Sequence, residues 1–308
     1  MIYLNNIAAV VVTYNRLNML QKCLSAIKNQ TVGCDIIIIN NNSSDGTEEW
    51  VKDNIISESG IIYRNTHQNI GGSGGFNTGM RIAVEKGYEY VWIMDDDCIP
   101  CLDALETLIK AGEIIGRGNF GYLSSVVLWK DGTECKMNRQ KIKKTYYNYS
   151  HLLKHGIIQV EQSTFVSLLF SSEVIKNVGL PVKEFFIWGD DIEYTRRIAV
   201  RNGIPSFMVC GSQVVHEMAK NNGSNIVIDG LDRIGRYKFT FRNESYLYRK
   251  EGVKGALFYF AKCGVYFFRI LFKSPNYKLK RLGVLIGSMI KGIFFNPKIE
   301  YIQEDKNG

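Results

Sequence analysis

The segment Tyr90–Pro100, with the sequence YVWIMDDDCIP, constrains the fold more than any other part of the chain. Its first five residues are apolar strand formers, so we expect a strand that is buried on both faces of a parallel sheet. Three carboxylates, Asp95, Asp96 and Asp97, follow at once. Ligands of open α/β sheets bind beyond the carboxyl ends of the strands, and adjacent like charges there favour a bound cation. Oxygen ligands suit Mg²⁺ or Mn²⁺, and the alternative is an acidic turn exposed to water.

Upstream of this segment, stretches typical of strands alternate with stretches typical of helices. Apolar, largely β-branched runs at Ile7–Thr13, Asp35–Ile39 and Ile61–Arg64 predict three strands. Apolar residues recur at helical spacing between Leu17 and Ile27, and Asn40–Thr47 has the composition of a turn that caps a helix. This alternation predicts a doubly wound, mostly parallel sheet.

A glycine cluster, Asn69–Phe76 with the sequence NIGGSGGF, precedes an expected helix that ends near Glu85. The cluster has neither the spacing of a dinucleotide-binding motif nor the Lys-Ser/Thr of a phosphate-binding P-loop. Four glycines in five residues indicate that the backbone approaches another group closely or adopts positive φ angles. We therefore expect a glycine-rich loop that contacts a ligand, with a mobile loop as the alternative.

The elements expected after Pro100 are less regular. A helix is predicted at Leu102–Ile109, and strands are predicted at Phe120–Leu128, Thr164–Phe170 and Ile204–Val215. Residues 130–160 contain basic and aromatic side chains without a clear period, and we expect an irregular excursion there.

A second acidic motif, Trp188-Gly189-Asp190-Asp191, stands at an expected helix start. Paired carboxylates there can supply a general base, separately from a cation-binding site. His216 ends the last predicted strand. An isolated histidine is ordinarily a core or surface residue, but at a strand end it can also ligate a metal.

The composition describes a globular protein with an excess of positive charge. The 308 residues carry a net charge of +8, which favours an anionic partner. Seven scattered cysteines favour reduced thiols, and Cys98 and Cys101 form a CxxC by spacing only. Residues 1–15 lack a charged region and a cleavage site, so we expect no signal peptide.

The positive charge is concentrated in the C-terminal third. From Arg233 to Lys298 there are fifteen Lys or Arg and two Glu, interleaved with Phe and Tyr. Gly255–Phe272 and Leu282–Phe295 carry charges that make them poor transmembrane spans, and both fit basic amphipathic helices at a membrane surface. The alternatives are packing against the catalytic domain or contact with a partner subunit.

The order of the motifs VVVTYNR, NNNSSDGT, NIGGSGGF, DDD and WGDDIEYTRR, followed by His216, resembles the family 2 glycosyltransferases of GT-A fold. Within that family the galactofuranosyltransferase-like branch is the most similar. The resemblance spans roughly Ile7 to Arg242 and implies a GT-A catalytic domain at 1–230. Its nucleotide-sugar half would cover about 1–100 and its acceptor half about 101–230, with a helical region at 231–308. The dipeptide Arg242-Asn243 resembles one that follows the catalytic domain in this branch.

By motif position, the resemblance implies the following site residues. Those expected to bind the nucleotide sugar are Thr13, Asn15, Arg16, Asn40, Asp45, Gly71, Gly72, Ser73, Gly74, Gly75, Asp95 and Asp96. Asp191 is expected to be the general base, Asp190 to assist catalysis, and Trp188 and Asp190 to bind the acceptor. Asp95, Asp97 and His216 are expected to ligate Mn²⁺ or Mg²⁺. The family often has Asp where this chain has Asn40, which leaves the nucleotide base unresolved.

The implied function is an inverting, metal-dependent transfer from UDP-galactofuranose to a glycan or polyprenyl-linked glycan of the bacterial cell surface. A rhamnosyl or other hexosyl donor is the alternative within the class. We expect a cytoplasmic enzyme attached peripherally to the inner face of the membrane, with oligomerisation through the C-terminal region left open. A nucleic-acid-binding protein is the alternative of another class, and it is disfavoured because two acidic clusters would repel a phosphate backbone.

Overall fold

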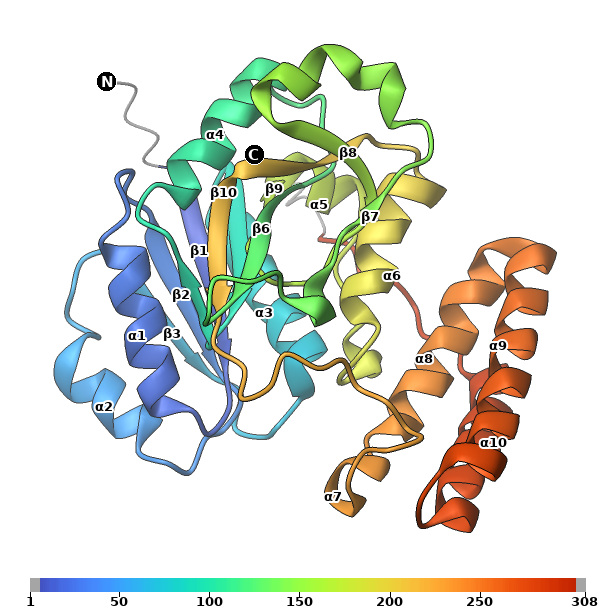
Figure 1. Cartoon of the computed structure of the whole chain (residues 1–308). Helices are drawn as coiled ribbons and strands as arrows, with labels where there is room; N and C mark the ends of the chain where they lie inside the picture. Colours follow the sequence, from blue (N-terminus) through green and yellow to red (C-terminus); the bar gives the residue numbers. More distant parts are fainter. Residues whose placement is uncertain (1–5, 303–308) are drawn as a thin grey trace.

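The computed structural model describes residues 6–302, so the parts of the signal-peptide and domain predictions that fall on residues 1–5 and 303–308 lie outside the described residues. One sheet organises the catalytic part, in the order β3-β2-β1-β4-β9-β6-β10-β8-β7, with β5 paired to β10 (Figure 1). The strands are β1 (Ile7–Thr13), β2 (Asp35–Asn40), β3 (Ile61–Asn65), β4 (Tyr90–Asp95), β5 (Cys98–Pro100), β6 (Leu123–Trp129), β7 (Lys141–Ile142), β8 (Ile157–Gln162), β9 (Leu168–Ser171) and β10 (Ser206–His216).

Strand β1 lies in the middle of a parallel block, with β2 on one side and β4 on the other. All seven of its residues are buried, as expected for a strand covered on both faces. Alternate residues enter two different cores: Ala9 and Val11 pack with one set of helices, Ala8 and Val10 with another. This double coverage confirms the predicted doubly wound α/β fold.

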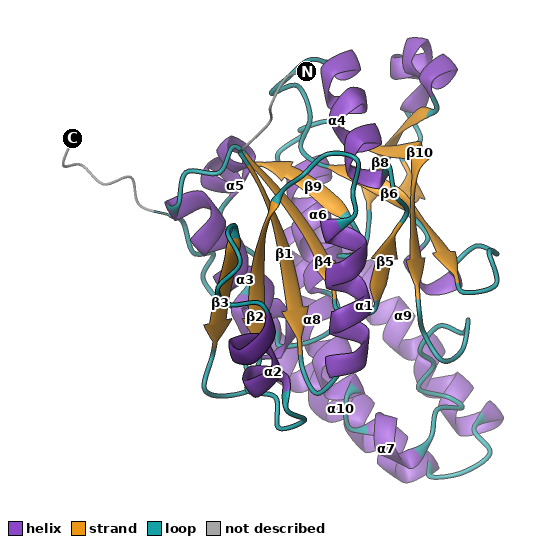
Figure 2. Cartoon of the chain, turned by 90° about the vertical axis from the view of Figure 1, so that its left-hand side faces the viewer, coloured by secondary structure: helices purple, strands orange, loops and turns teal. Residues whose placement is uncertain are grey.

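Helices cover both faces of the sheet (Figure 2). Those that pack on the face of Ala9 are α1 (Leu17–Lys28), α2 (Thr47–Asn54) and α4 (Ala104–Ile115). Those on the face of Ala8 are α3 (Gly71–Glu85), α5 (Ser172–Val178) and α6 (Asp190–Arg196), and a π-helical turn at Arg197–Arg201 extends α6. Short 3₁₀ segments lie at Lys136–Asn138, Tyr146–His155 and Lys183–Phe185.

The strand directions bring distant residues to one edge of the sheet. Strand β9 is antiparallel to both β4 and β6, and β6 is parallel to β10. Strands β6 and β10 therefore run in the same direction as β4, so the carboxyl ends of β4 and β10 lie at the same edge. Strand β5 then returns antiparallel along β10 and pairs Cys98 with His216. His216 therefore lies beside the aspartates that follow β4.

Several predicted boundaries are wrong in their details. The glycine cluster is not a loop, because Gly71 already begins α3. The strand predicted at Thr164–Phe170 is shorter, since Ser167 has φ +59° and β9 begins at Leu168. The region 130–160, which was predicted to be irregular, ends in strand β8. Polar and apolar residues do not alternate regularly along β8, so its sequence did not indicate a strand. The helix predicted at Leu102–Ile109 runs instead from Ala104 to Ile115.

The C-terminal region is helical, with α7 (Leu231–Ile234), α8 (Tyr237–Lys250), α9 (Gly252–Lys273) and α10 (Lys278–Phe294). These helices share a core of their own and stand beside the catalytic part, with α8 nearest to it (Figure 1). Fully buried Arg281 of α10 donates to the backbone carbonyls of Ile226 and Asp229. Ser274 donates to the carbonyl of Val227. The helices therefore fix the chain segment that leads from His216 to α7.

Helix α9 differs from the sequence-based expectation. Among the described residues it alone is long and apolar enough to cross a membrane, with a mean hydropathy of 1.4 over its window, of which 17% is buried. The prediction that Gly255–Phe272 is too charged to span a bilayer is therefore wrong, as far as length and composition decide it. One of the two charges that prompted it, Lys262, forms an ion pair with Glu244 of α8.

Candidate active site

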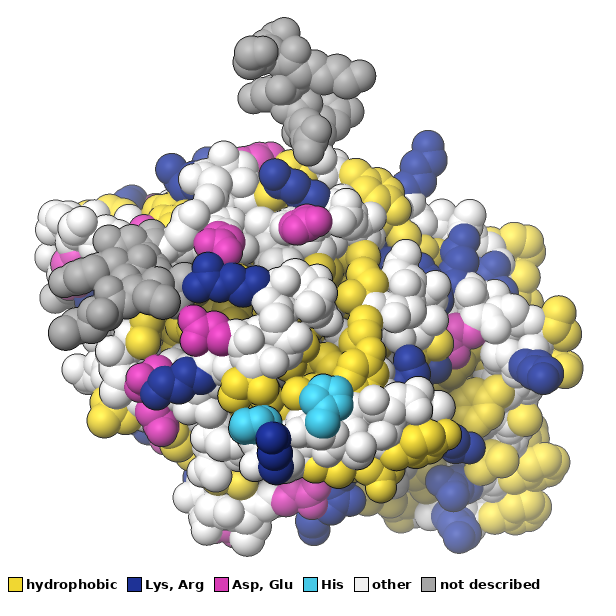
Figure 3. All heavy atoms as spheres, turned by 90° about the horizontal axis from the view of Figure 1, so that it is seen from above, with side chains coloured by type: hydrophobic (Ala, Val, Ile, Leu, Met, Phe, Trp, Pro, Cys, Tyr) yellow, Lys and Arg dark blue, Asp and Glu magenta, His cyan; other side chains and the backbone are white. Residues whose placement is uncertain are grey.

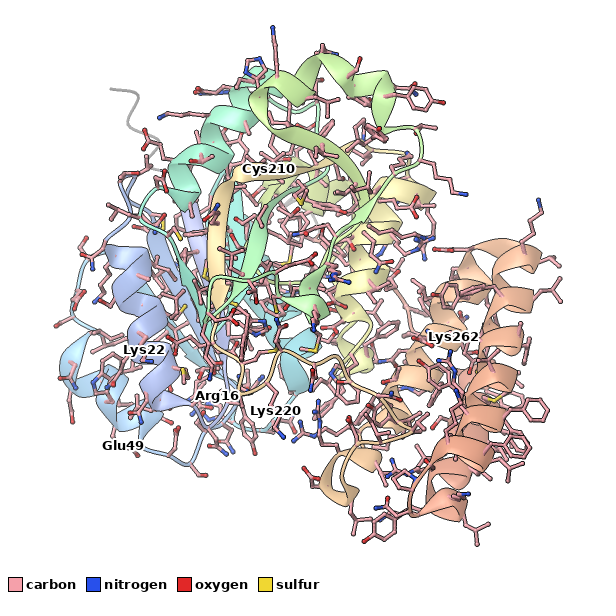
Figure 4. The ribbon with its side chains drawn as sticks, viewed as in Figure 1. Arg16, Lys22, Glu49, Cys210, Lys220 and Lys262 are labelled. Carbon is pink, nitrogen blue, oxygen red and sulfur yellow. The ribbon has the colours of Figure 1, made fainter. Side chains whose placement is uncertain are left out.

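The three aspartates after β4 occupy different environments. Asp96 is buried and accepts a hydrogen bond from Thr13 Oγ1 at 2.8 Å. Asp97 is also buried. Nη1 of Arg16 lies between the two carboxylates, 2.5 Å from Asp97 Oδ2 and 3.4 Å from Asp96 Oδ1. Arg16 lies at the carboxyl end of the parallel strands, just before α1 (Figure 4). Asp95 remains partly exposed. Asp96 and Asp97 are thus held by two side chains, one at the end of β1 and one just after it.

His216 completes this cluster from the end of β10. Its Nε2 lies 3.0 Å from Asp97 Oδ1, and its Nδ1 lies 2.8 Å from the amide oxygen of Asn138. Asn138 accepts from Nδ1–H, which orients the ring and directs Nε2 toward Asp97. This contact was not predicted, because Asn138 falls in the stretch without a recognisable period. Only the three-dimensional arrangement identifies it.

The electrostatics of the cluster show a shortage of positive charge. Burial and the charge of Asp97 raise the pKa of Asp95 to about 8. Burial also raises the pKa of Asp96 to about 6, against the effect of Arg16. Burial alone would lower the pKa of His216, but its hydrogen bond to Asp97 and the nearby carboxylates raise that pKa to about 10. Three carboxylates in partial burial therefore attract a cation.

The donor set fits a divalent cation of the Mg²⁺ or Mn²⁺ type. Asp97, Cys98 and His216 each place a ligand atom within 4.8 Å of the others. Burial and the charges of Asp97 and Asp95 raise the pKa of the Cys98 thiol well above its usual range, which disfavours it as a thiolate ligand. Carboxylate oxygen and one imidazole nitrogen remain, a set suited to Mn²⁺ and Mg²⁺. The seven cysteines, all within the described residues, are unpaired.

The residues predicted for the nucleotide line the turns beside this cluster. Asn15 and Asp45 border a shallow depression together with Arg16 and Leu17. Asp45 Oδ2 accepts from the Leu17 amide at 2.9 Å, and Asn15 Oδ1 accepts from the Ser44 amide at 2.7 Å. These bonds join the turn after β1 to the turn after β2.

Asn40 has a different place from the one predicted for a base-contacting residue. It is fully buried at the end of β2, its amide donates to Tyr63 Oη at 2.8 Å, and its oxygen accepts from the Ser43 amide at 2.9 Å. Both ends of the amide are thus engaged inside the protein. Contact between Asn40 and a base stays a prediction.

The glycine cluster is explained by packing within the chain. A Cβ on Gly71 would lie 2.0 Å from the carbonyl oxygen of Phe186, and one on Gly75 would lie 2.5 Å from Val12 Cγ1. Gly74 is crowded by Ile70, and Ser73 is buried with its hydroxyl donating to the carbonyl of Val182. The predicted close approach is therefore confirmed, but its partners are protein atoms. Gly72 alone in the cluster has open space beside its Cα.

The second acidic pair begins α6, as predicted. Asp190 is buried, and burial, the charge of Asp191 and the charge of Asp95 raise its pKa well above the usual range. Burial raises the pKa of Asp191 to about 6, although its Oδ1 accepts from the Ile192 amide at 2.7 Å. At neutral pH Asp191 is therefore ionised, and the raised pKa of Asp190 favours its protonated form. Since the charge of Asp95 contributes to the raised pKa of Asp190, the two acidic clusters lie near one another.

Trp188 precedes this pair and packs against the C-terminal helices. Its ring lies 5.1 Å from that of Tyr237, the first residue of α8, and it borders the core that α8, α9 and α10 share. A wall of the site is therefore built from the helical region, which the sequence did not indicate.

Comparisons with known proteins identify the class. Residues 8–155 match the family model described as "Glycosyl transferase family 2". The crystal structure of GalNAc-T7 with UDP, GalNAc and Mn²⁺ is similar in fold, with a TM-score of 0.63 at 14% identity over 81% of this chain. The crystal structure of S. aureus TarS gives a TM-score of 0.52 at 12% identity over 94% of this chain. The matched parts cover 48% and 44% of those two chains. Residues 8–155 thus match the family 2 glycosyltransferases, and the chain has the GT-A fold.

Similar proteins with assigned activities indicate which members of the family this chain resembles. Galactofuranosyltransferase GlfT1 of Mycobacterium tuberculosis is 27% identical over 299 residues, covering 90% of this chain and 95% of the relative. GlfT1 of Mycolicibacterium smegmatis is 26% identical over 270 residues, covering 82% and 85%. Glycosyltransferase AglE of Haloferax volcanii is 23% identical over 199 residues, covering 62% and 60%. The chain is thus a glycosyltransferase similar to galactofuranosyltransferases along most of its length.

Proposed function

We propose that this glycosyltransferase transfers galactofuranose from UDP-galactofuranose to a hydroxyl group of a glycan or polyprenyl-linked glycan, with inversion at the anomeric carbon. The observation that supports the reaction best is the meeting of two acidic clusters from distant parts of the sequence. One cluster carries an imidazole and suits a cation, and the other carries a carboxylate that is ionised at neutral pH. Separate leaving-group and base functions are what a direct displacement requires.

The residues divide into a donor side and an acceptor side. Asp97 and His216, with Asp95, would hold the cation, which supplies positive charge to the departing diphosphate. Asn15, Arg16 and Asp45 line the depression that would receive the nucleotide. Arg16 already lies beside the aspartates, so its guanidinium is placed to meet the diphosphate.

On the acceptor side, Asp191 takes the proton of the attacking hydroxyl. The acceptor oxygen forms a bond to the anomeric carbon while the bond from that carbon to the diphosphate breaks and UDP leaves. A base with a pKa of about 6 is ionised at neutral pH and still accepts a proton. Asp190, whose pKa is raised by burial, can donate a hydrogen bond to the sugar acceptor when it is protonated, and Trp188 offers an aromatic surface.

The donor is assigned from the relatives, since two galactofuranosyltransferases align with most of this chain. The test is a panel of nucleotide sugars assayed for nucleotide release with Mn²⁺, Mg²⁺ or EDTA. UDP-galactofuranose is expected to give the fastest release, and EDTA is expected to abolish it. Faster release from a rhamnosyl or other hexosyl donor would replace the donor assignment and leave the reaction class intact.

We further propose that α9 and α10 attach the enzyme to an anionic membrane surface on the cytoplasmic side, where a lipid-linked acceptor would lie. Large hydrophobic side chains are exposed along both helices: Leu257, Phe258, Phe268 and Phe272 of α9, and Leu279, Ile290 and Phe294 of α10. Lysine and arginine side chains lie among them, and hydrophobic surface is visible beside basic groups at the right-hand edge in Figure 3. Apolar burial and about 1 kcal/mol per basic residue near anionic lipid support such binding.

Liposome co-sedimentation tests this attachment. Binding to anionic vesicles, weakened by salt, is expected for the full chain. A Leu257→Glu/Phe268→Glu variant should lose it, whereas Ile114→Glu, which alters an exposed apolar residue of α4, should keep it. Extraction of the bound protein by alkaline carbonate distinguishes surface attachment from a membrane-spanning α9. A chain that stays in the supernatant with every vesicle contradicts the proposal.

A further inference from the structure

The segment that carries the acceptor side of the site has an unusual backbone. Phe186 has φ +66° and ψ −62°, and the amide of Ile187 donates to the carbonyl of Phe185 at 2.8 Å, which defines a γ-turn. Trp188 has φ +64° and Gly189 has φ +86°. Two bulky residues with positive φ, directly before Asp190, are strained. Such a conformation persists only where the surroundings fix it, and residues 184–189, here called the 184–189 loop, are held from two sides.

Helix α3 holds one side of this loop. The amide of Ser73 donates to the carbonyl of Phe186 at 3.2 Å, and Gly71 lets that carbonyl approach where any Cβ would clash. This accounts for one carbonyl of the loop.

Helix α8 holds the other side, through two consecutive residues. The side-chain amide of Asn243 donates to the carbonyls of Phe185 at 3.0 Å, Ile187 at 3.2 Å and Trp188 at 2.8 Å. Asn243 is fully buried. Its oxygen accepts from Nε and Nη2 of Arg242, at 3.0 and 2.8 Å. Arg242 Nη2 also donates to the carbonyl of Glu184 at 2.6 Å.

The arrangement is specific to an amide. A buried amide nitrogen surrounded by three carbonyl oxygens can only donate, and the adjacent guanidinium fixes which end of the Asn243 side chain is oxygen. Most carbonyls from Glu184 to Trp188 therefore receive their hydrogen bonds from one dipeptide of a helix in the C-terminal region. The ring of Phe186 adds a stacking contact with Phe239 of α8, at 4.9 Å.

We propose that Asn243, oriented by Arg242, is a positioning residue for transfer: it holds the 184–189 loop so that Trp188, Asp190 and Asp191 face the donor. This inference deepens the proposed function and rests on it, because it assigns to the helical region a part in building the acceptor site. The donor side is built from the turns after β1, β2 and β4. Within residues 6–302, Asn243 forms no hydrogen bond with these turns.

The activity test uses Asn243→Asp, which keeps the shape of the side chain. It replaces the NH₂ group with a carboxylate oxygen, which repels the three carbonyl oxygens. We expect kcat for transfer to fall roughly 10²-fold and the KM for acceptor to rise, because a displaced base and acceptor wall impair both. The Kd for UDP, measured by calorimetry, should change less than about threefold, since the donor side is untouched. If Asn243→Asp does not fold, Arg242→Met serves in its place, with an expected loss of about tenfold.

The matched control is Arg249→Ala, six residues further along α8. Arg249 likewise donates to backbone carbonyls, those of Gly292 and Phe295 at 2.9 and 2.6 Å, but these belong to the end of α10. Its loss should loosen the helical region without changing the ratio of kcat to acceptor KM by more than about threefold. An equal loss of transfer in Arg249→Ala and Asn243→Asp, or a parallel loss of UDP binding, would overturn the positioning role.

Hydrogen exchange measured by mass spectrometry separates this inference from the proposed function, because it needs no substrate. Asn243→Asp should raise amide exchange most in a peptide covering 183–193, and Arg249→Ala should raise it most near 288–296, with a smaller effect at 183–193 because the Phe295 ring packs on Phe185. Unchanged exchange at 183–193 in Asn243→Asp overturns the inference even if the enzyme transfers galactofuranose. Raised exchange there in a protein that transfers no sugar from any donor would leave the loop contact standing and refute the function.

Discussion

The substitution Asp191→Asn should stabilise the protein at neutral pH while removing its activity. Burial raises the pKa of this carboxyl group from 3.8 to about 6. An acidic group whose pKa rises on folding stabilises the folded state at pH values below its pKa in the unfolded chain. This stabilisation is lost as the pH rises from about 4, the unfolded pKa, to about 6, the folded pKa. A shift of about 2 units corresponds to about 3 kcal/mol of unfolding free energy forfeited at pH 7.5.

Because asparagine is neutral at every pH, Asp191→Asn should recover much of this energy. With an unfolding entropy of about 2.1 cal/mol/K per residue, 3 kcal/mol corresponds to a rise in Tm of about 4–5 °C at pH 7.5. At pH 4 the gain should vanish, since the carboxyl group is then protonated. Turnover should fall by about 10²-fold or more, the usual scale for loss of a general base.

The assay is calorimetry at pH 4 and pH 7.5 on EDTA-treated protein, together with transfer kinetics. The matched control is Asp53→Asn, on the exposed face of α2, which should leave Tm within about 1 °C at both values of pH. A Tm of Asp191→Asn at or below that of the wild type at pH 7.5, or a gain that persists at pH 4, would refute the reasoning.

The other predictions concern the two clusters and the core. Asp97→Ala should weaken UDP binding in Mn²⁺ as well as turnover, whereas Asp191→Asn should leave UDP binding unchanged; equal binding by both variants in calorimetry would contradict the division of roles. The rate of transfer should fall about tenfold per pH unit below about 6, since Asp191 must be ionised to accept a proton, and a rate independent of pH between 5 and 7 would exclude it as the base. Gly75→Ala should cost about 1–3 kcal/mol in denaturant unfolding, because the new Cβ would lie 2.5 Å from Val12 Cγ1, and Gly72→Ala, with open space, is its control.

Local patterns were sufficient for the first half of the fold. The apolar runs that became β1, β2 and β4 are buried on both faces, so their composition identifies them, and the short apolar run of the half-buried edge strand β3 was sufficient as well. The acidic residues at the ends of two elements also followed from sequence, because charges after an apolar run lie at its exposed end. The doubly wound α/β sheet was expected on this basis and is confirmed, and so is the GT-A architecture that the family resemblance implied.

Contacts between distant segments could not be predicted in this way. Asn138 orients His216 across 78 positions, and Asn243 binds a loop 55 to 58 positions earlier. Neither residue stands in a periodic or charged pattern. The glycine cluster signalled a close approach, but the sequence could not show that the approaching groups are Phe186 and Val12 rather than a ligand. Polar side chains that bond to backbone carbonyls leave no trace in composition.

The central claim is that Asp97 and His216 hold a divalent cation beside the nucleotide while Asp191 stands apart from it. The most direct measurement is a crystal structure of the protein with Mn²⁺ and UDP, with the metal located by its anomalous scattering. We expect one strong peak at coordination distance from Asp97 and His216, in contact with the UDP diphosphate and remote from Asp191. A peak coordinated by Asp190 or Asp191, or UDP bound without metal at the aspartates after β4, would contradict the account.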